Sequence, residues 1–229
     1  MTEEADTFNW PPLESNPEVF TSYLHSLGLS SQWSIGEVFG FDEDLLAYLP
    51  QPIIGVIVAV ENLERTDDRE RGTEGGDIVP YYMKQTEELD NACGVIACLH
   101  ACLNNSDKVE LTPGSILERF YAGSKDLSPA DKATYLENAT EFKERHADAA
   151  TEGQSAQASE QEDVRHHFVA FVLNERHQLV ELDGTKKGPN VVAEGCADVL
   201  RGTIAEIQRR LAEGDISESL NMMTLNATP

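Results

Sequence analysis

The sequence predicts a single α+β domain, on three observations. An unbroken aliphatic run, Ile53 to Val60, is too short and too rich in β-branched residues for a helix and fits a strand buried on both faces. Two more apolar runs, His167 to Leu173 and Gln178 to Leu182, are separated by a polar turn and predict a hairpin. Apolar residues at helical spacing occupy much of the rest. We expect one domain over residues 1–229, with no C-terminal extension, because this length suffices to bury a core.

The first helix is marked at both ends. Asn16 is a suitable cap, Pro17 fits the first helical position and Gly28 fits the end. Between them, four apolar residues recur at helical spacing: Phe20, Tyr23, Leu24 and Leu27. A second, short helix is expected over Asp42 to Tyr48, since Pro50 follows it.

The middle of the chain alternates between loops and helices. Glu61 to Asp77 is charged and contains glycines, which predicts a mobile loop. Small and apolar residues from Cys93 to Leu103 predict a helix, and Leu127 to Ala147 predicts another that starts at Ser128-Pro129.

Ala147 to Asp163 contains no aromatic residue and no Val, Ile, Leu or Met. Such a segment has too little apolar surface to offset its ordering entropy, so we expect a long flexible loop immediately before the hairpin. A helix follows the hairpin, with Leu200, Ile204, Ile207 and Leu211 on one face, and Leu220 to Asn226 is expected to be the last strand.

The composition excludes some classes of function. With 17 basic and 41 acidic residues the formal net charge is −24, which argues against a nucleic-acid binder and against binding to an anionic membrane surface. The charge fits either simple solubility or a basic protein partner. The acidic N-terminus does not resemble a signal peptide, and the longest aliphatic run is too short to span a bilayer. We therefore expect four reduced cysteines in a cytoplasmic protein, also compatible with the nucleus.

Cys93 is the first candidate for chemistry. It stands at the start of a predicted helix, where the positive end of the helix dipole and a nearby imidazolium favour the thiolate form that nucleophilic attack needs. The alternative is that Cys93 is a small buried apolar residue, the common state of a free cysteine.

Most of the other cysteines and histidines are not expected to take part in chemistry. Cys98 and Cys102 share a helix face while His100 points the other way, so we expect core packing and no metal site. His100 also lies too far along the helix to reach Cys93. Three more histidines are placed on an exposed face, in a polar segment and in a turn: His25, His146 and His177.

His166 and His167 open the predicted hairpin on opposite faces, and the pattern alone does not decide between them. Asp183 closes the second strand of that hairpin. Asp183-Gly184 is an ordinary turn signal, but a carboxylate there can also accept a hydrogen bond from an imidazole on the neighbouring strand.

Four blocks, in order, resemble the ubiquitin C-terminal hydrolase family of deubiquitinating enzymes, in its short single-domain form. They are Trp10 to Val19, Asp44 to Val60, Gln85 to Ala101 with Asn91-Ala92-Cys93-Gly94, and the pair His167-Phe168-Val169-Ala170 with Glu181-Leu182-Asp183-Gly184. The likeness covers nearly the whole chain. It implies a papain-like fold, a central antiparallel sheet flanked by helices, with a knotted backbone.

Carried over by position, the resemblance makes Cys93 the nucleophile, His167 the general base and acid, and Asp183 the residue that orients His167. Gln85 would donate to the oxyanion together with the backbone N–H of Cys93. Here Gln85 and Cys93 are eight residues apart, two more than is usual in the family, so the chain between them must bulge or lengthen.

The implied activity is thiol hydrolysis at the C-terminus of ubiquitin, through a thioester and without a cofactor or metal. The implied ubiquitin contacts are Pro12, Leu13, Glu14, Asn16 and Leu220. Residues 147–163 match the family's crossover loop over the active site, and we expect a monomer. Three alternatives stay open: hydrolysis of a ubiquitin-like modifier, a catalytically silent ubiquitin-binding module, and a papain-like amidase acting on small molecules.

Overall fold

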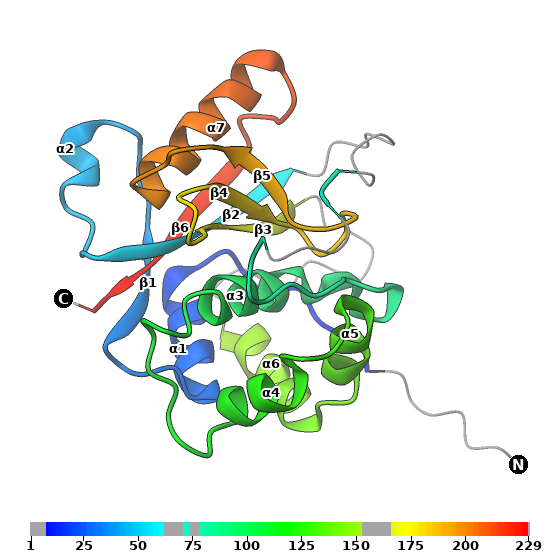
Figure 1. Ribbon diagram of the computed structural model, residues 1–229. Coiled ribbons are helices and arrows are strands. Elements are labelled where there is room, and N and C mark those ends of the chain that lie inside the picture. Colours follow the sequence, from blue (N-terminus) through cyan, green and yellow to red (C-terminus); the bar gives the residue numbers. More distant parts are fainter. Residues whose placement is uncertain (1–7, 62–70, 74–77, 153–165, 229) are drawn as a thin grey trace, which may run out of the picture.

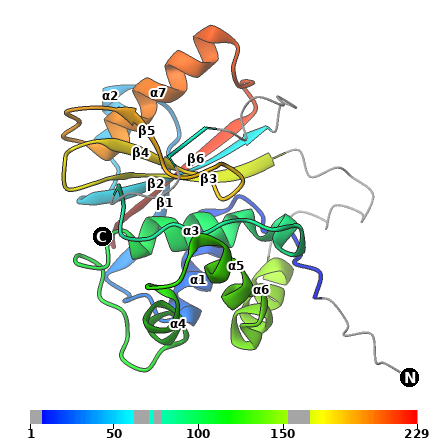
Figure 2. The same cartoon turned by 45° about the vertical axis from the view of Figure 1, so that its right-hand side comes forward.

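The computed structural model describes residues 8–61, 71–73, 78–152 and 166–228. A twisted sheet separates two layers of helices (Figure 1). The larger layer lies on one side of the sheet, and α7 and α2 lie on the other, as the turned view also shows (Figure 2). Within the described residues, no helix is both long enough and apolar enough to cross a membrane.

The sheet has six strands in the order β1-β6-β2-β3-β4-β5, and every pairing is antiparallel. Their bounds are β1 Trp33–Glu37, β2 Ile53–Glu61, β3 His166–Leu173, β4 Leu179–Leu182, β5 Asn190–Ala193 and β6 Leu220–Ala227. The predicted strands are confirmed, and β2 and β3 occupy the centre, as their two apolar faces require. The α+β class and the central antiparallel sheet are confirmed, whereas the predicted knot stays a prediction.

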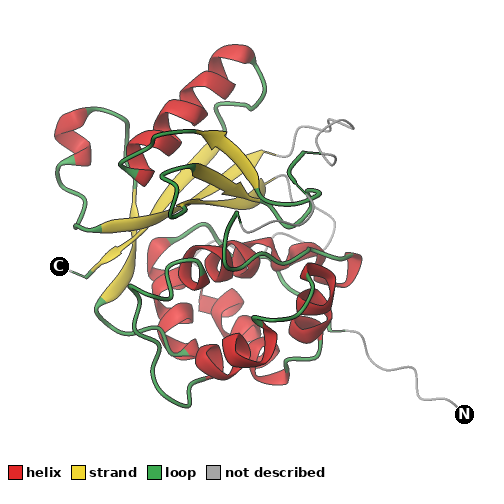
Figure 3. Ribbon diagram, in the orientation of Figure 1, coloured by secondary structure: helices red, strands yellow, loops and turns green. Residues whose placement is uncertain are grey.

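Five helices form the larger layer: α1 Pro17–Leu27, α3 Cys93–Leu103, α4 Ile116–Ser124, α5 Pro129–Glu137 and α6 Thr140–Glu152. In Figure 3 the red helices of this layer lie below the yellow sheet, and α3 lies directly under it (labelled in Figure 1). Every residue of α3 is buried, because α3 packs on β3 and β2 above and shares one apolar core with the other helices below, with Gly94 against Phe20 of α1. The first helix is capped as predicted: the Asn16 side chain accepts from the N–H of Glu18, and Gly28 ends the helix with a left-handed conformation.

The opposite face of the sheet is covered by α7 Val199–Glu213, with α2 Glu43–Leu46 near its end. Leu200, Ile204 and Ile207 face the sheet as predicted. Arg210, on the same helix, forms a two-point ion pair with Glu181 of β4, at 2.6 and 3.0 Å. Both side chains are buried and little solvated, so each charge is neutralised by the other.

One predicted helix and one predicted loop are wrong in part. The segment predicted as a single helix over Leu127–Ala147 is two helices, which break at Asn138-Ala139. The second, α6, continues to Glu152, so residues 147–152 of the predicted 147–163 loop are helical. Alanine favours the helical state, and Ala149 is buried. The segment lacks larger apolar residues, so its sequence did not indicate this burial. Residues 153–163 lie outside the described residues.

Of the predicted loop over residues 61–77, residues 62–70 and 74–77 lie outside the described residues, and the others have defined contacts. Glu61 ends β2, and the backbone of residues 71–73 pairs with the chain after β4: Lys187 donates to Arg71 at 3.0 Å and Thr73 donates to Pro189 at 3.1 Å. Gly72 has a positive φ of 95°, and a Cβ there would lie 2.0 Å from the carbonyl oxygen of Gly188. A glycine is required because two backbones meet at this point.

Candidate active site

Cys93 begins α3, as predicted, under the first residues of β3. It is 7% exposed. The chain enters α3 through a 3₁₀ helix, η2, over Glu87–Ala92, which contains one non-helical residue, Leu89. Leu89 is fully buried, while Glu87, Glu88 and Asp90 are exposed. The longer spacing between Gln85 and Cys93 is therefore accommodated as a short helical turn anchored by one leucine.

The structure selects His167 over His166. The Nε2 atom of His167 lies 2.8 Å from Oδ1 of Asp183, and the Cys93 thiol interacts with the same imidazole closely enough to help raise its pKa. His166 is exposed, and its Nε2 lies 3.0 Å from the hydroxyl of Ser219. The three residues therefore meet although they come from the start of α3, the start of β3 and the end of β4.

Electrostatics couple His167 to Asp183. Burial alone would lower the pKa of His167, but the charge and hydrogen bond of Asp183, with a smaller contribution from Cys93, raise the pKa above its ordinary value. Burial would likewise raise the pKa of Asp183, but the charge and hydrogen bond of the His167 imidazolium outweigh the effect of burial. The pKa of Asp183 therefore lies well below its usual range. The side chains of His167 and Asp183 are 15% and 4% exposed, so this pair is screened little by solvent.

Asp183 is itself held in place. Its Oδ1 accepts hydrogen bonds from the N–H and the hydroxyl of Thr185, at 2.9 and 2.8 Å, and its Oδ2 lies 3.7 Å from Nζ of Lys186. These contacts stabilise the carboxylate and fix its direction. A fixed carboxylate in turn fixes the ring nitrogen that His167 presents to it, so the other nitrogen is left for the sulfur.

The backbone of Gln85 contacts the turn after Asp183, and its side chain is hydrogen-bonded within η2. The backbone N–H of Gln85 donates to the carbonyl of Gly184 at 2.9 Å, which places it beside Asp183. Its side-chain Nε2 donates to the carbonyl of Asp90 in η2 at 2.6 Å, and its Oε1 is buried without a hydrogen-bond partner. One of the two amide hydrogens is thus used inside the longer turn, a contact that sequence reasoning did not find.

Two of the remaining histidines are core residues. His100 is fully buried, as its place on α3 suggests, and its Nε2 accepts from the N–H of Met83 at 3.1 Å. The prediction for His146 was wrong: its polar neighbours suggested exposure, yet it is fully buried and donates to the carbonyl of Pro11 at 2.6 Å. Trp10 packs edge-on against it, which explains the burial.

The other two histidines lie outside the core. His25 is half-buried and its Nε2 contacts the carbonyl of Trp33 at 2.8 Å, so it is less exposed than predicted. His177 is exposed in the turn of the hairpin, as predicted.

The residues implied as ubiquitin contacts are dispersed around this site. Leu13 is buried next to Gly94, the residue after Cys93: a Cβ built on Gly94 would lie 3.6 Å from the Leu13 side chain. Pro12 is exposed and Glu14 is half-buried, and Asn16 serves as the cap of α1. Leu220 begins β6 in register with Val60, which in turn pairs with His167. Their role in binding stays a prediction.

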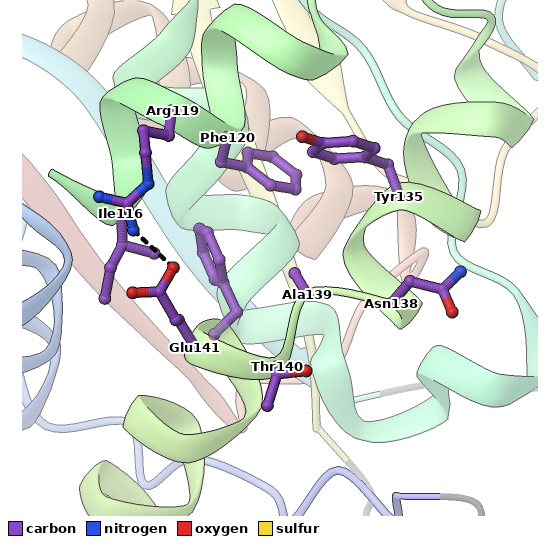
Figure 4. A pocket seen from close by; sticks show the side chains of 9 residues that line it. Ile116, Arg119, Phe120, Tyr135, Asn138, Ala139, Thr140 and Glu141 are labelled. Carbon is purple, nitrogen blue, oxygen red and sulfur yellow. Dashed lines mark hydrogen bonds and ion pairs between the residues drawn. The ribbon is translucent and has the colours of Figure 1, made fainter. Parts of the chain in front are cut away.

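The described part of the chain has no grouped metal ligands, and it has a hollow between helices. No three of the described His, Cys, Asp and Glu side chains are grouped to hold a metal ion, and Cys98 and Cys102 are buried in the core. A hollow of about 390 Å³ lies between α4, α5 and α6, lined by Phe120, Tyr135 and the Arg119–Glu141 ion pair (Figure 4). None of the three candidate catalytic residues lines it.

Comparison with known proteins agrees with this geometry. The family model for ubiquitin carboxyl-terminal hydrolase, family 1, matches residues 10–212. The chain belongs to this family. A ubiquitin carboxyl-terminal hydrolase of Aplysia californica is 35% identical over 92% of this chain and 98% of its own length. A probable ubiquitin carboxyl-terminal hydrolase of Dictyostelium discoideum is 34% identical, over 96% of this chain and 89% of its own length.

The fold is likewise found among solved structures. The catalytic domain of Trichinella spiralis UCH37, solved with ubiquitin vinyl methyl ester, superposes with a TM-score of 0.77 over 96% of each chain, at 24% identity. The predicted family, fold class and enzyme class are confirmed: the chain is a cysteine-type hydrolase of the ubiquitin carboxyl-terminal hydrolase family, with the fold of that family.

Proposed function

We propose that this hydrolase cleaves ester, thioester, peptide or isopeptide bonds at the carboxyl terminus of ubiquitin, with Cys93 as nucleophile, His167 as general base and acid, and Asp183 as the residue that orients His167. The observation that carries the assignment of residues is their convergence: His167 and Asp183, from different strands, meet at 2.8 Å, and the Cys93 thiol at the start of α3 interacts electrostatically with the same imidazole.

The proposed reaction has two halves. His167 takes the proton of the Cys93 thiol, and the sulfur attacks the last carbonyl carbon of ubiquitin. The tetrahedral intermediate then collapses as the bond to the leaving amine breaks and His167 donates this proton to that nitrogen. Water then attacks the thioester, gives a proton to His167, and the carbon–sulfur bond breaks. The Cys93 thiol is restored and ubiquitin leaves with a free carboxylate.

Gln85 is proposed as a donor to the tetrahedral oxygen. Its amide has two hydrogens, and Asp90 accepts only one of them. The other is available to a substrate oxygen if the amide keeps its present direction. Its position next to Gly184, and so next to the catalytic aspartate, supports this role.

The proposed partner is ubiquitin, and the charge of the chain fits it. A net charge of −24 suits a partner that presents a basic face. We also expect a monomer in the cytoplasm or nucleus, which binds neither nucleic acid nor membrane.

The deciding experiment uses ubiquitin with a C-terminal electrophile such as a vinyl methyl ester. We expect one molecule of probe on the wild-type chain, attached to the Cys93 peptide in a mass-spectrometric digest, and none on Cys93→Ala. Cys98→Ala is the matched control, because Cys98 lies on the same helix in the core. An unlabelled wild-type chain, or label on another cysteine, would refute the assignment.

The same probe chemistry separates the alternatives. A ubiquitin-like modifier with the same electrophile tests the second candidate substrate, and faster labelling by that modifier would transfer the proposal to it. A silent binding module would bind ubiquitin without reacting. A small-molecule amidase would react with neither protein probe.

A further inference from the structure

The segment before the nucleophile and the turn after β4 are joined by a set of hydrogen bonds that the reaction scheme does not use. The Tyr82 hydroxyl lies 2.8 Å from the carbonyl oxygen of Asp183 and 2.9 Å from that of Lys186, and donates its one hydrogen between them. Nζ of Lys84 donates to the carbonyls of Lys186 and Lys187, the latter at 3.0 Å.

A third donor extends the same set. The N–H of Gln85 donates to the carbonyl of Gly184 at 2.9 Å. We call these bonds, from the hydroxyl of Tyr82, Nζ of Lys84 and the N–H of Gln85 to the carbonyls of residues 183–187, the brace. Its acceptors lie in the turn that contains the catalytic aspartate, and its last donor is the candidate oxyanion residue.

The contact between the two segments is tight. A Cβ on Gly184 would lie 2.9 Å from the backbone nitrogen of Gln85 and 3.0 Å from its Cβ, closer than side chains normally approach. The separation between Asp183 and Gln85 therefore depends on this direct backbone contact. Any loosening of the turn would move the aspartate and the glutamine relative to each other.

Tyr82 is well placed to keep the turn closed. Its ring stacks on His100 of α3, with 5.3 Å between centroids and 7° between planes, so the hydroxyl is fixed by the same helix that begins at Cys93. Burial and the charge of Asp183 raise the pKa of Tyr82, which keeps the phenol protonated as a donor.

We propose that Tyr82 is a positioning residue: its hydroxyl, through the brace, holds Asp183 in line with His167 and keeps Gln85 against the turn at Gly184. This rests on the proposed catalytic roles of those residues. Tyr82 does not touch the reacting atoms. It acts through the direction of the Asp183 carboxylate, and so through the charge that His167 retains.

The test compares two tyrosines that follow each other in the chain. Tyr82→Phe removes the hydroxyl of the brace and keeps the ring. Tyr81→Phe removes an equally buried hydroxyl, which lies 3.1 Å from Oγ of Ser124, away from the turn. The readouts are kcat and KM on a fluorogenic ubiquitin amide, and the pH dependence of Cys93 alkylation by iodoacetamide, followed on the Cys93 peptide.

For Tyr82→Phe we expect kcat to fall roughly three- to tenfold with little change in KM, since one hydrogen bond is lost outside the substrate site. The midpoint of alkylation should move up by about half a pH unit, because a less aligned Asp183 holds less charge on His167. Tyr81→Phe should match the wild type in both. If Tyr82→Phe does not fold, Lys84→Met removes the second side-chain donor of the brace and is read in the same way.

Equal behaviour of Tyr82→Phe and Tyr81→Phe, or a change in KM without a shift in alkylation, would overturn the proposal. Failure of the proposed function looks different. If the wild-type chain does not hydrolyse the ubiquitin substrate, the alkylation profiles still report whether Tyr82 controls His167, because iodoacetamide needs no ubiquitin.

Discussion

The candidate active site and the helical core bury the same kind of side chain with opposite results. At the candidate active site, Asp183 raises the pKa of His167 above its ordinary value. In the helical core, burial lowers the pKa of both His100 and His146 to about 4, and it outweighs their hydrogen bonds with backbone groups and, for His100, the charge of Asp183. A direct hydrogen bond from the ring to a buried carboxylate, made by His167 and not by His100, thus distinguishes a histidine that carries charge from one that only packs.

The strongest way to break this comparison is Asp183→Asn, which keeps the shape and removes the charge. His167 should then resemble the core histidines, with a lowered pKa and a poorly fixed ring. We expect kcat to fall by roughly 10³–10⁴-fold. The measurement is steady-state hydrolysis of a fluorogenic ubiquitin amide, with the His167 ring titrated by NMR. Glu181→Gln is the control, two residues earlier on β4, where the ion pair with Arg210 faces α7. Activity near the wild-type value in Asp183→Asn would show that the carboxylate does not control the charge and orientation of His167 during the reaction.

Gln85→Ala tests the proposed donor to the oxyanion. Loss of an oxyanion donor should lower kcat by roughly 10²–10³-fold with KM nearly constant. The Gln85 side-chain amide also donates to the carbonyl of Asp90, which holds the amide against η2. A rate close to wild type would mean that this bond keeps the amide away from the substrate oxygen, and that backbone donors alone serve the oxyanion.

His146 provides the corresponding test in the core. Its pKa of about 4 in the native state lies below the ordinary 6.5, so the unfolded chain binds more protons between these values. The free energy of unfolding should therefore fall as the pH falls, by about 2 kcal/mol between pH 7 and pH 5 for one such group. Urea unfolding at both pH values measures it. In His146→Phe, which preserves packing on Trp10, the fall should be smaller by this amount. His177→Asn, exposed in its turn, should retain the wild-type fall.

Local patterns predicted the secondary structure well where cap and periodicity agree. The ends of α1 follow from Asn16, Pro17 and Gly28, and the central place of β2 and β3 follows from their two apolar faces. The elements that the pattern missed are short or weakly marked: β1, β5 and α4. The start of α4 has a capping signal in Ser115 and Glu118, which a closer reading would have found.

The residues of the candidate site could be predicted from the sequence, but their burial and hydrogen bonds could be predicted less well. The residues alone left Cys93 with two candidate histidines, and family resemblance was needed to choose His167. Burial of His146 depends on Trp10, 136 positions earlier in the chain, so no local window contains it. The bond from Gln85 to Asp90 and the brace from Tyr82 likewise depend on how two segments meet in space, which periodicity does not record.

The smallest expected effect concerns charges outside both buried regions. The net charge of −24 acts through solvent, where salt screens it, whereas the His167–Asp183 pair is almost completely buried. Raising the ionic strength should therefore slow association with ubiquitin, by about tenfold or less, and leave kcat at saturating substrate unchanged. Stopped-flow binding of labelled ubiquitin to Cys93→Ala measures the first quantity and steady-state turnover of the wild type the second. An association rate that ignores salt would mean that the acidic surface serves solubility alone. A kcat that falls with salt would mean that the buried pair is open to ions, contrary to its 15% and 4% exposure.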